Sequence, residues 1–151
     1  MDYKKALNKC MHICSQREYC INDIEQRLAK WDVKKSEHQK IIEYLLAEKY
    51  IDHNRYVSAF VNDKFTYNHW GKIKIRYQLK QKKIDEPTIN KYVDTINATA
   101  YKQAIQHEVS KKLKSVKGKN DFEKKQKTAR YVVSKGFEPN EVFNILNLDN
   151  I

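Results

Sequence analysis

The sequence predicts an all-α protein in which three tandem three-helix repeats, each resembling a helix-turn-helix unit, form an elongated curved array. Only three Gly and two Pro occur in 151 residues, too few for the turns of a β-sandwich or barrel. Hydrophobic residues make up 40% of the chain and charged residues 32%, which favours thin helical layers over one thick core. Apolar residues also recur at helical spacing along most of the chain.

The first repeat is predicted to span residues 1–51. Its clearest helix lies in SEHQKIIEYLLAEKYI and is expected to end near Tyr50. Ser36 and Gln39 are interpreted as a capping box at its start, because a Ser and a Gln three residues later can satisfy each other's backbone N–H groups. Its apolar stripe consists of Ile41, Ile42, Leu45, Leu46 and Tyr50.

The second repeat is predicted to cover residues 52–97. Asp52 is well placed to cap its first helix, and Gly71 then interrupts the chain. The next segment, GKIKIRYQLKQKKI, alternates apolar and cationic residues as a half-buried strand does. A solitary strand would leave its backbone groups unpaired, and apolar residues four apart also fit a helix, so we interpret it as helical. A third helix follows, with Asp85 as its cap and Pro87 in its first turn.

The third repeat is predicted to comprise residues 98–151, with a long helix that ends before Gly118 and two further helices separated by Gly136. An internal repeat supports the three units, because in each of them one apolar residue stands five positions before another. These pairs are Leu28 and Val33, Leu79 and Ile84, and Val132 and Phe137. Two helices cannot bury their apolar faces alone, so adjacent units should stack.

Positive charge increases along the chain, whose formal net charge is +11. The first repeat holds ten basic and eight acidic residues, the second nine and five, and the third eleven and six. A surface of this kind attracts polyanions, so the contact surface is expected in the second half of the chain. The alternative is that these lysines are the solvated faces of an ordinary helical protein.

Two basic clusters are the candidate binding sites. The first places six cations and no acid within residues 72–83, directly after Tyr67 and Trp70, and consists of Lys72, Lys74, Arg76, Lys80, Lys82 and Lys83. The second spans the loop between two predicted helices and consists of Lys111, Lys112, Lys114, Lys117, Lys119, Lys124, Lys125 and Lys127, with Arg130 following. Side chains that neutralise phosphates release counterions, so binding there should weaken with salt.

The tyrosines are expected to serve the core. Seven of them lie on or near apolar stripes, and packing is the prediction for most, with base stacking as the exception. They are Tyr19, Tyr44, Tyr50, Tyr56, Tyr77, Tyr92 and Tyr131.

No catalytic site, metal or cofactor is expected. Cys10, Cys14 and Cys20 crowd one end of the chain without CxxC spacing, so reduced thiols are favoured over zinc or a disulfide framework. The histidines are scattered, and no Gly-rich phosphate loop, serine nucleophile elbow or HExxH motif occurs. No stretch reaches about 18 apolar residues, so we expect a cytoplasmic protein that does not enter membranes. We also expect it to be a binding protein and a monomer.

Four segments match the pattern of one known family in order and spacing. They are CINDIEQRL, through Cys20, Asp23, Ile24, Arg27 and Leu28; LLAEKYIDHNRYVSAFV, through Leu46, Ile51, Asp52, Arg55 and Tyr56; GKIKIRYQLKQKKI, through Gly71, Ile75, Leu79, Lys82 and Ile84; and VVSKGFEPNEVFNIL, through Lys135, Gly136 and Phe137. On these segments nearly the whole chain resembles the RecX family of bacterial regulators of the RecA recombinase. It departs from the family pattern at Cys20, where Ser usually caps a helix, at His53, where a second Asp is usual, and at Lys83, where a turn Gly is usual.

The resemblance implies a modular helical array that lies in the helical groove of the RecA–DNA filament. Members of the family reduce ATP hydrolysis, strand exchange and coprotease activity of RecA without chemistry of their own, and direct binding to single- or double-stranded DNA is associated with them. The expected partners are therefore a RecA filament and DNA, and Lys83 is expected to need a left-handed backbone.

Overall fold

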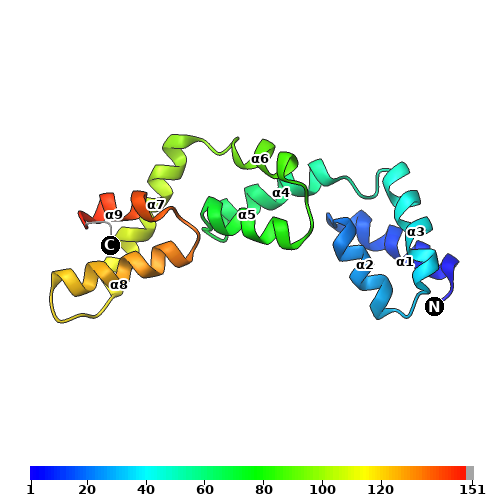
Figure 1. The fold of residues 1–151 in the computed structure, drawn as a ribbon, viewed down its shortest axis with the longest axis horizontal. Helices are drawn as coiled ribbons and strands as arrows, with labels where there is room; N and C mark the ends of the chain where they lie inside the picture. The colour runs from blue at the N-terminus through cyan, green and yellow to red at the C-terminus, as the bar shows by residue number, and fades with distance from the viewer. Residues whose placement is uncertain (149–151) are drawn as a thin grey trace.

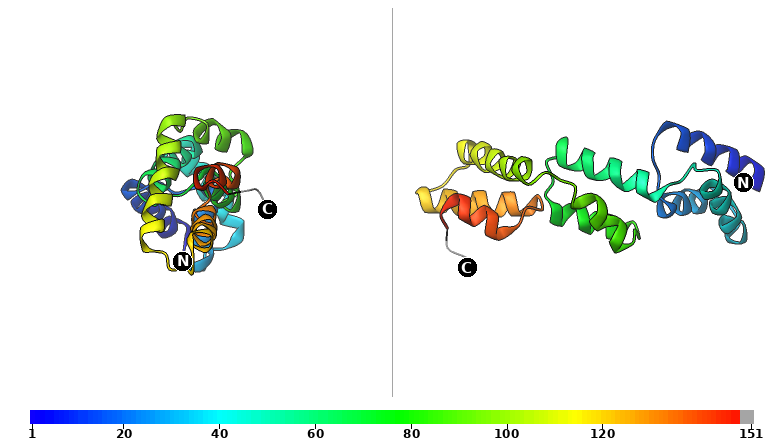
Figure 2. Two further views of the ribbon diagram at one scale, coloured as in Figure 1. Left: turned by 90° about the vertical axis from the view of Figure 1, so that its left-hand side faces the viewer. Right: turned by 90° about the horizontal axis from the view of Figure 1, so that it is seen from above.

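The structure, a computed structural model, describes residues 1–148, which form nine α-helices and no β-strand. The helices are α1 (Tyr3–Gln16), α2 (Ile21–Lys30), α3 (Lys35–Ala47), α4 (His53–Thr66), α5 (Lys72–Gln81), α6 (Glu86–Val93), α7 (Ala98–Ser115), α8 (Asp121–Ser134) and α9 (Pro139–Leu146). They form three groups of three that follow one another along the longest axis of the molecule (Figures 1 and 2). The predicted all-α fold of three tandem three-helix repeats is confirmed, while the boundaries at residues 51 and 97 stay predictions.

Each group of helices encloses its own small core. The fully buried side chains include Ile24, Leu28, Ile41 and Leu45 in the first group, Val57, Ile75, Leu79, Ile89 and Val93 in the second, and Ile105, Val132, Phe137 and Val142 in the third. Helices this short are marginal alone in water, so packing within each group is what stabilises them. None of the helices in residues 1–148 is both long and apolar enough to cross a lipid bilayer.

The segment with strand-like alternation is α5, as predicted. Ile75 and Leu79 are fully buried, whereas Ile73 and Tyr77 are 50% and 59% exposed. A helix turns by 3.6 residues, so residues four apart share a face and only one of the two apolar pairs can meet the core. The helix therefore leaves the other pair at the surface.

The turn after the second helix of each repeat has one shared geometry. A residue with positive φ occupies it in all three units: Asp32 (φ 56°), Lys83 (φ 61°) and Gly136 (φ 100°). In the first unit the Val33 N–H donates to the Leu28 carbonyl oxygen (3.0 Å). This hydrogen bond closes the helix end and buries the apolar pair that recurs in the sequence. The left-handed backbone expected at Lys83 is confirmed.

The helix starts predicted at Asp52 and Asp85 are confirmed. The Asp52 carboxylate accepts from the Arg55 N–H (3.0 Å), and the Asp85 carboxylate accepts from the Thr88 N–H (3.0 Å). These hydrogen bonds satisfy one of the N–H groups that each helix start leaves free.

The capping box predicted at Ser36 and Gln39 is wrong. The helix α3 begins at Lys35, and its cap residue makes no side-chain capping hydrogen bond. Gln39 instead donates to a Glu43 carboxylate oxygen (2.9 Å). Because the preceding turn buries Val33, the helix begins earlier in the chain than predicted. Ser36 therefore lies inside the first helical turn and cannot cap it.

The end predicted for this helix near Tyr50 is also too late. The helix α3 ends at Ala47, because Lys49 adopts a left-handed backbone (φ 60°) and the Ile51 N–H turns back to the Leu45 carbonyl oxygen (3.1 Å). This turn buries Ile51 in the first core.

The prediction that tyrosines mostly pack in the core is wrong for three of the seven. Tyr19 and Tyr56 are buried and Tyr50 and Tyr92 half-buried, but three others are at least 40% exposed: Tyr44, Tyr77 and Tyr131. Whether a ring is buried depends on how much of its helix the neighbouring helices cover. The apolar stripe along a single helix does not show this coverage.

The second and third repeats join through backbone hydrogen bonds. The Gly71 N–H donates to the Lys135 carbonyl oxygen (2.8 Å), and the Ile73 N–H donates to the Gly136 carbonyl oxygen (3.0 Å). The start of α5 thus lies against the end of α8, and N–H groups unpaired at one helix end bond to carbonyls at the other. A Cβ on Gly71 would lie 2.3 Å from the backbone of Gly136, so no larger residue fits there.

Tyr101 of α7 completes this junction. Its hydroxyl accepts from the Lys72 N–H (3.0 Å) and donates to the Glu138 carboxylate. Its ring stacks on Phe65 of α4 at 5.8 Å between centres and packs on Phe137 at 5.5 Å. Burial raises the pKa of this hydroxyl and keeps it protonated as a donor.

Candidate functional site

The first basic cluster, residues 72–83, is largely engaged within the protein. Five of its six cations make internal contacts: Lys72 with the Tyr101 ring (4.6 Å to its centre), Lys74 with the Trp70 ring (4.5 Å), Arg76 with Asp94 (3.3 Å), Lys80 with Glu86 (3.3 Å) and Lys82 with Asp23 (2.5 Å). Lys83 has no ion pair or ring contact among residues 1–148. The helix α5 spreads its four cations over several faces, and Lys82 and Lys83 follow it in the turn, so the cluster is not one continuous patch.

The second basic cluster is freer. It covers the end of α7, the following loop and the start of α8, at one tip of the array (Figure 1). Lys112 lies over the Tyr131 ring (4.4 Å), and Lys127 contacts Glu123 (3.2 Å) and the Lys117 carbonyl oxygen (2.8 Å). The others have no ion pair or ring contact within the described chain: Lys111, Lys114, Lys117, Lys119, Lys124, Lys125 and Arg130.

The loop that presents the second cluster begins and ends in a defined way. The helix α7 ends at Ser115, and the Asn120 side chain caps α8 by accepting from the Glu123 N–H (2.9 Å). Behind it, Lys135 pairs with the buried carboxylate of Glu108 (3.3 Å), which ties α8 to α7. The cluster therefore stands on a fixed helical hairpin, not on a loose tail.

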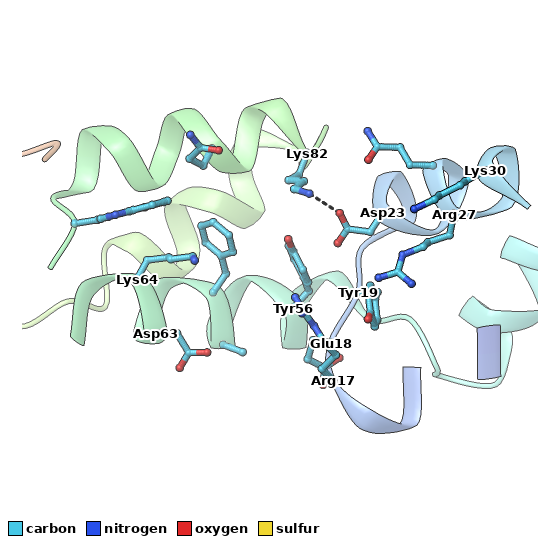
Figure 3. A pocket seen from close by; sticks show the side chains of 15 residues that line it. Arg17, Glu18, Tyr19, Asp23, Arg27, Lys30, Tyr56, Asp63, Lys64 and Lys82 are labelled. Carbon is cyan, nitrogen blue, oxygen red and sulfur yellow. Dashed lines mark hydrogen bonds and ion pairs between the residues drawn. The ribbon is translucent and has the colours of Figure 1, made fainter. Parts of the chain in front are cut away.

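A groove that the sequence did not reveal lies between the first and second repeats (Figure 3). Its volume is about 780 Å³, and its walls are formed by residues of α2 and the segment before it, of α4, and of α5 and the residues that flank it. They are Arg17, Glu18, Tyr19, Asp23, Gln26, Arg27, Lys30, Tyr56, Ala59, Phe60, Asp63, Lys64, Trp70, Gln78 and Lys82. Only Lys82 belongs to a predicted cluster, because no spacing along the chain links the others.

Two of the three carboxylates that line this groove, those of Asp23 and Glu18, form ion pairs across the repeat boundary. Asp23 accepts from Lys82 (2.5 Å) and from the Cys20 N–H (3.2 Å). Burial alone raises the pKa of Asp23, but these hydrogen bonds outweigh it and leave the pKa below its usual value. Glu18 pairs with Arg55 (2.6 Å). The groove's remaining cations are left without carboxylate partners among the described residues.

Three of those four cations, Arg17, Arg27 and Lys64, rest on aromatic rings, and Lys30 does not. Arg17 and Arg27 lie 5.0 and 5.5 Å from the centre of the Tyr19 ring. Lys64 lies 4.9 Å from the centre of the Trp70 ring. Cation–π contacts of this kind hold a charged group in place without neutralising it. The groove is thus a second candidate for anion binding, beside the second basic cluster.

One imidazole also helps to join the first two repeats. His53 Nε2 accepts from the Ile21 N–H (3.1 Å), so this nitrogen carries no proton. Burial lowers the pKa of His53, and Asp85, Asp52 and Asp23 offset that effect only in part.

The cysteines show no feature of a reactive or metal-binding site. Burial raises the pKa of Cys10 to about 12 and of Cys14 and Cys20 to about 11, so they are thiols at neutral pH. No group of His, Cys, Asp and Glu within residues 1–148 could hold a metal ion. Cys10 is buried and Cys14 is half-buried, while Cys20 packs into the core of the second repeat.

Comparison with known proteins gives a consistent result. Sequence models of the second and third three-helix domains of RecX match residues 52–92 and 100–146, together more than half of the chain. A regulatory protein RecX of Staphylococcus epidermidis is 26% identical over 96% of this chain and 54% of its own length, and one of Chlorobium phaeobacteroides is 25% identical over 97% and 94%. The chain thus spans about half of the former relative and nearly all of the latter. A crystal structure of a regulatory protein RecX shares the fold, with a TM-score of 0.87 at 20% identity over 96% of this chain and 72% of that one.

Proposed function

The chain belongs to the RecX family, and on that premise we propose that it binds RecA–DNA filaments and lowers the ATPase, strand-exchange and coprotease activities of RecA. It acts by binding, with no reaction or cofactor of its own, as a monomer in the cytoplasm. The observation that carries the proposal is the cluster of unpaired cations at the tip of the third repeat. A fixed array of this kind suits a regular polyanion such as a filament of protein and DNA.

The second basic cluster is assigned to the phosphates of the DNA. Most of its lysines have no ion pair within the described chain that would have to break on binding. Their electrostatic attraction to phosphates is therefore not offset by lost internal contacts. If about six phosphates of single-stranded DNA are neutralised, the slope of log K against log salt is about −4.

The first cluster is assigned to the protein side of the filament. The helix α5 exposes Ile73 and Tyr77 one turn apart, flanked by Lys80 and Lys83. An aliphatic and an aromatic side chain framed by cations suit a protein surface with acidic margins better than a bare phosphate chain.

The test is a RecA ATPase assay on single-stranded DNA with increasing amounts of the protein. We expect turnover to fall at stoichiometric amounts or below, and co-sedimentation with the filaments. A variant with Lys111, Lys114, Lys124 and Lys125 changed to Gln should bind filaments roughly tenfold more weakly, with a flatter salt dependence. The matched control changes Lys4, Lys5, Lys34 and Lys40 to Gln, since these are exposed cations of the first repeat.

An alternative function is nucleic-acid binding that acts independently of RecA, which the free lysines of the third repeat also favour. Salt-dependent binding to bare DNA or RNA, with RecA turnover unchanged and no co-sedimentation, would select it. Neutralising the first cluster instead is a less clean test, because it also breaks the contacts of Arg76, Lys80 and Lys82 within the protein.

A further inference from the structure

The groove between the first two repeats has cations at its two ends. Figure 3 shows Lys64 at one end, on α4, and Arg17, Arg27 and Lys30 at the other, on the segment before α2 and in the last turn of α2. Lys64, Arg17 and Arg27 are held on aromatic rings, and the groove's carboxylates nearest the boundary are already paired. The end with Arg17, Arg27 and Lys30 therefore offers net positive charge to a ligand, whereas at the other end the carboxylate of Asp63 lies next to Lys64 and offsets part of its charge.

The middle of the groove carries no net charge, because apart from the ion pair of Lys82 with Asp23 its lining is uncharged. Tyr56, Phe60 and Ala59 of α4 line it between the two ends. Burial raises the pKa of the Tyr56 hydroxyl, so the ring stays neutral. A ligand that carries charge at every position would place charge against this apolar stretch, where it loses water without gaining a partner.

Two of the aromatic rings that line the groove, those of Tyr19 and Trp70, are already in contact with cations and are less open to stacking bases. Two cations contact the Tyr19 ring, and two more contact the Trp70 ring, Lys64 at 4.9 Å and Lys74 at 4.5 Å. Single-stranded nucleic acids depend on open ring faces for much of their affinity and carry a phosphate at every nucleotide. Both features fit this groove poorly.

We infer that the groove binds an extended acidic polypeptide segment of a partner protein, with carboxylates at two separated positions and an apolar side chain between them. The carboxylates meet Lys64 at one end and Arg27 and Lys30 at the other, and the apolar side chain lies on Tyr56 and Phe60. A volume of about 780 Å³ lies within the range of sites that enclose a ligand. The segment would bridge the first two repeats, and its binding does not depend on RecA being the partner.

The test uses a fluorescein-labelled peptide of about twelve residues, ~40 Å long when extended, with Glu pairs flanking a central Leu pair. Fluorescence anisotropy should show binding to the full chain and none for the peptide with Gln in place of Glu. Changing Arg27, Lys30 and Lys64 together to Gln should weaken binding about tenfold, since three partly exposed ion pairs are lost. The matched control changes Lys4, Lys5 and Lys40 to Gln, which removes equal charge elsewhere and should leave the affinity within about twofold.

Two further measurements keep the result specific. Circular dichroism melts establish that both triple variants are folded. In a Trp31→Phe background Trp70 is the one remaining Trp, and because it lines the groove, its emission should change when the peptide binds.

Equal peptide affinity in the groove variant and the control variant overturns the inference. So does binding of an oligothymidylate that falls tenfold in the groove variant while peptide binding does not, because the groove is then a nucleic-acid site.

Discussion

The two junctions between successive repeats are held by different kinds of interaction. The second and third repeats meet backbone to backbone, through Gly71 and Gly136, with the ring of Tyr101 packed beside them. The first and second meet through side chains, by the pair of Asp23 with Lys82 and the imidazole of His53.

This difference determines what can alter each junction. Backbone hydrogen bonds between uncharged groups respond little to pH or salt, whereas a partly exposed ion pair weakens to some extent with salt and an imidazole changes its charge near neutrality. The array therefore has one fixed joint, which holds the two basic clusters relative to each other, and one that solution conditions can loosen. The joint that can be loosened, between the first and second repeats, is also the one that forms the groove.

The largest expected effect comes from filling the fixed joint. Changing Gly136 to Ala places a Cβ 2.4 Å from the Lys74 Cβ on a backbone with φ of 100°. We expect a loss of about 3 kcal/mol of stability in urea unfolding and a larger radius of gyration in solution scattering. In Gly118→Ala, the control, the nearest atoms are the Lys124 Cγ at 3.0 Å and the Lys124 backbone nitrogen at 3.1 Å, and the backbone does not have a positive φ, so the loss should be smaller, about 1 kcal/mol. Equal losses in the two variants contradict the steric explanation.

A smaller effect is expected from the ion pair of the other joint. Changing Asp23 to Asn removes the charge that meets Lys82 (2.5 Å) and weakens the hydrogen bond from the Cys20 N–H. Because Lys82 is about one third exposed, we expect a loss of only about 1 kcal/mol in urea unfolding, decreasing as salt is added. Glu86→Gln, which breaks the more exposed pair with Lys80, should cost less than about 0.5 kcal/mol. If Asp23→Asn costs no more than this control, the joint does not depend on its charges.

The smallest effect is the response of this joint to pH. The pKa of His53 in the folded protein lies below its ordinary value of 6.5. Its contribution to stability is therefore present above pH 6.5 and is lost as the pH falls through the folded pKa, because the unfolded chain takes up the proton more readily. One such group changes stability by at most about 1.4 kcal/mol per pH unit. Thermal melts between about pH 7.5 and pH 5 should show less loss for His53→Gln than for the parent protein. An identical pH dependence in the two proteins excludes His53 as its source.

Much of the fold could be predicted because its signals are local. Helical spacing, the caps Asp52 and Asp85 and the recurring apolar pair in each unit all act over a few residues, so they can be read along the chain. The errors occurred where a neighbouring element decides. Ser36 lost its expected cap role to a turn that buries Val33, and three tyrosines were left exposed because no helix covers them.

The candidate site was predictable only in part. The sequence marked both basic clusters as candidates, with the cluster at residues 72–83 first. The structure engages most of that cluster in internal contacts and leaves most of the second cluster free. The groove had no counterpart in the sequence, since Arg27 and Lys64 lie 37 positions apart and meet only when two repeats join.

The sequence by itself determined the number and kind of the repeats and where positive charge collects, because helix periodicity and net charge are properties of short segments. Only the tertiary structure decided which cations remain free, which glycines touch, and that a groove opens between the first two repeats. These depend on pairs of residues far apart in the chain, whose meeting is set by the packing of one repeat on the next.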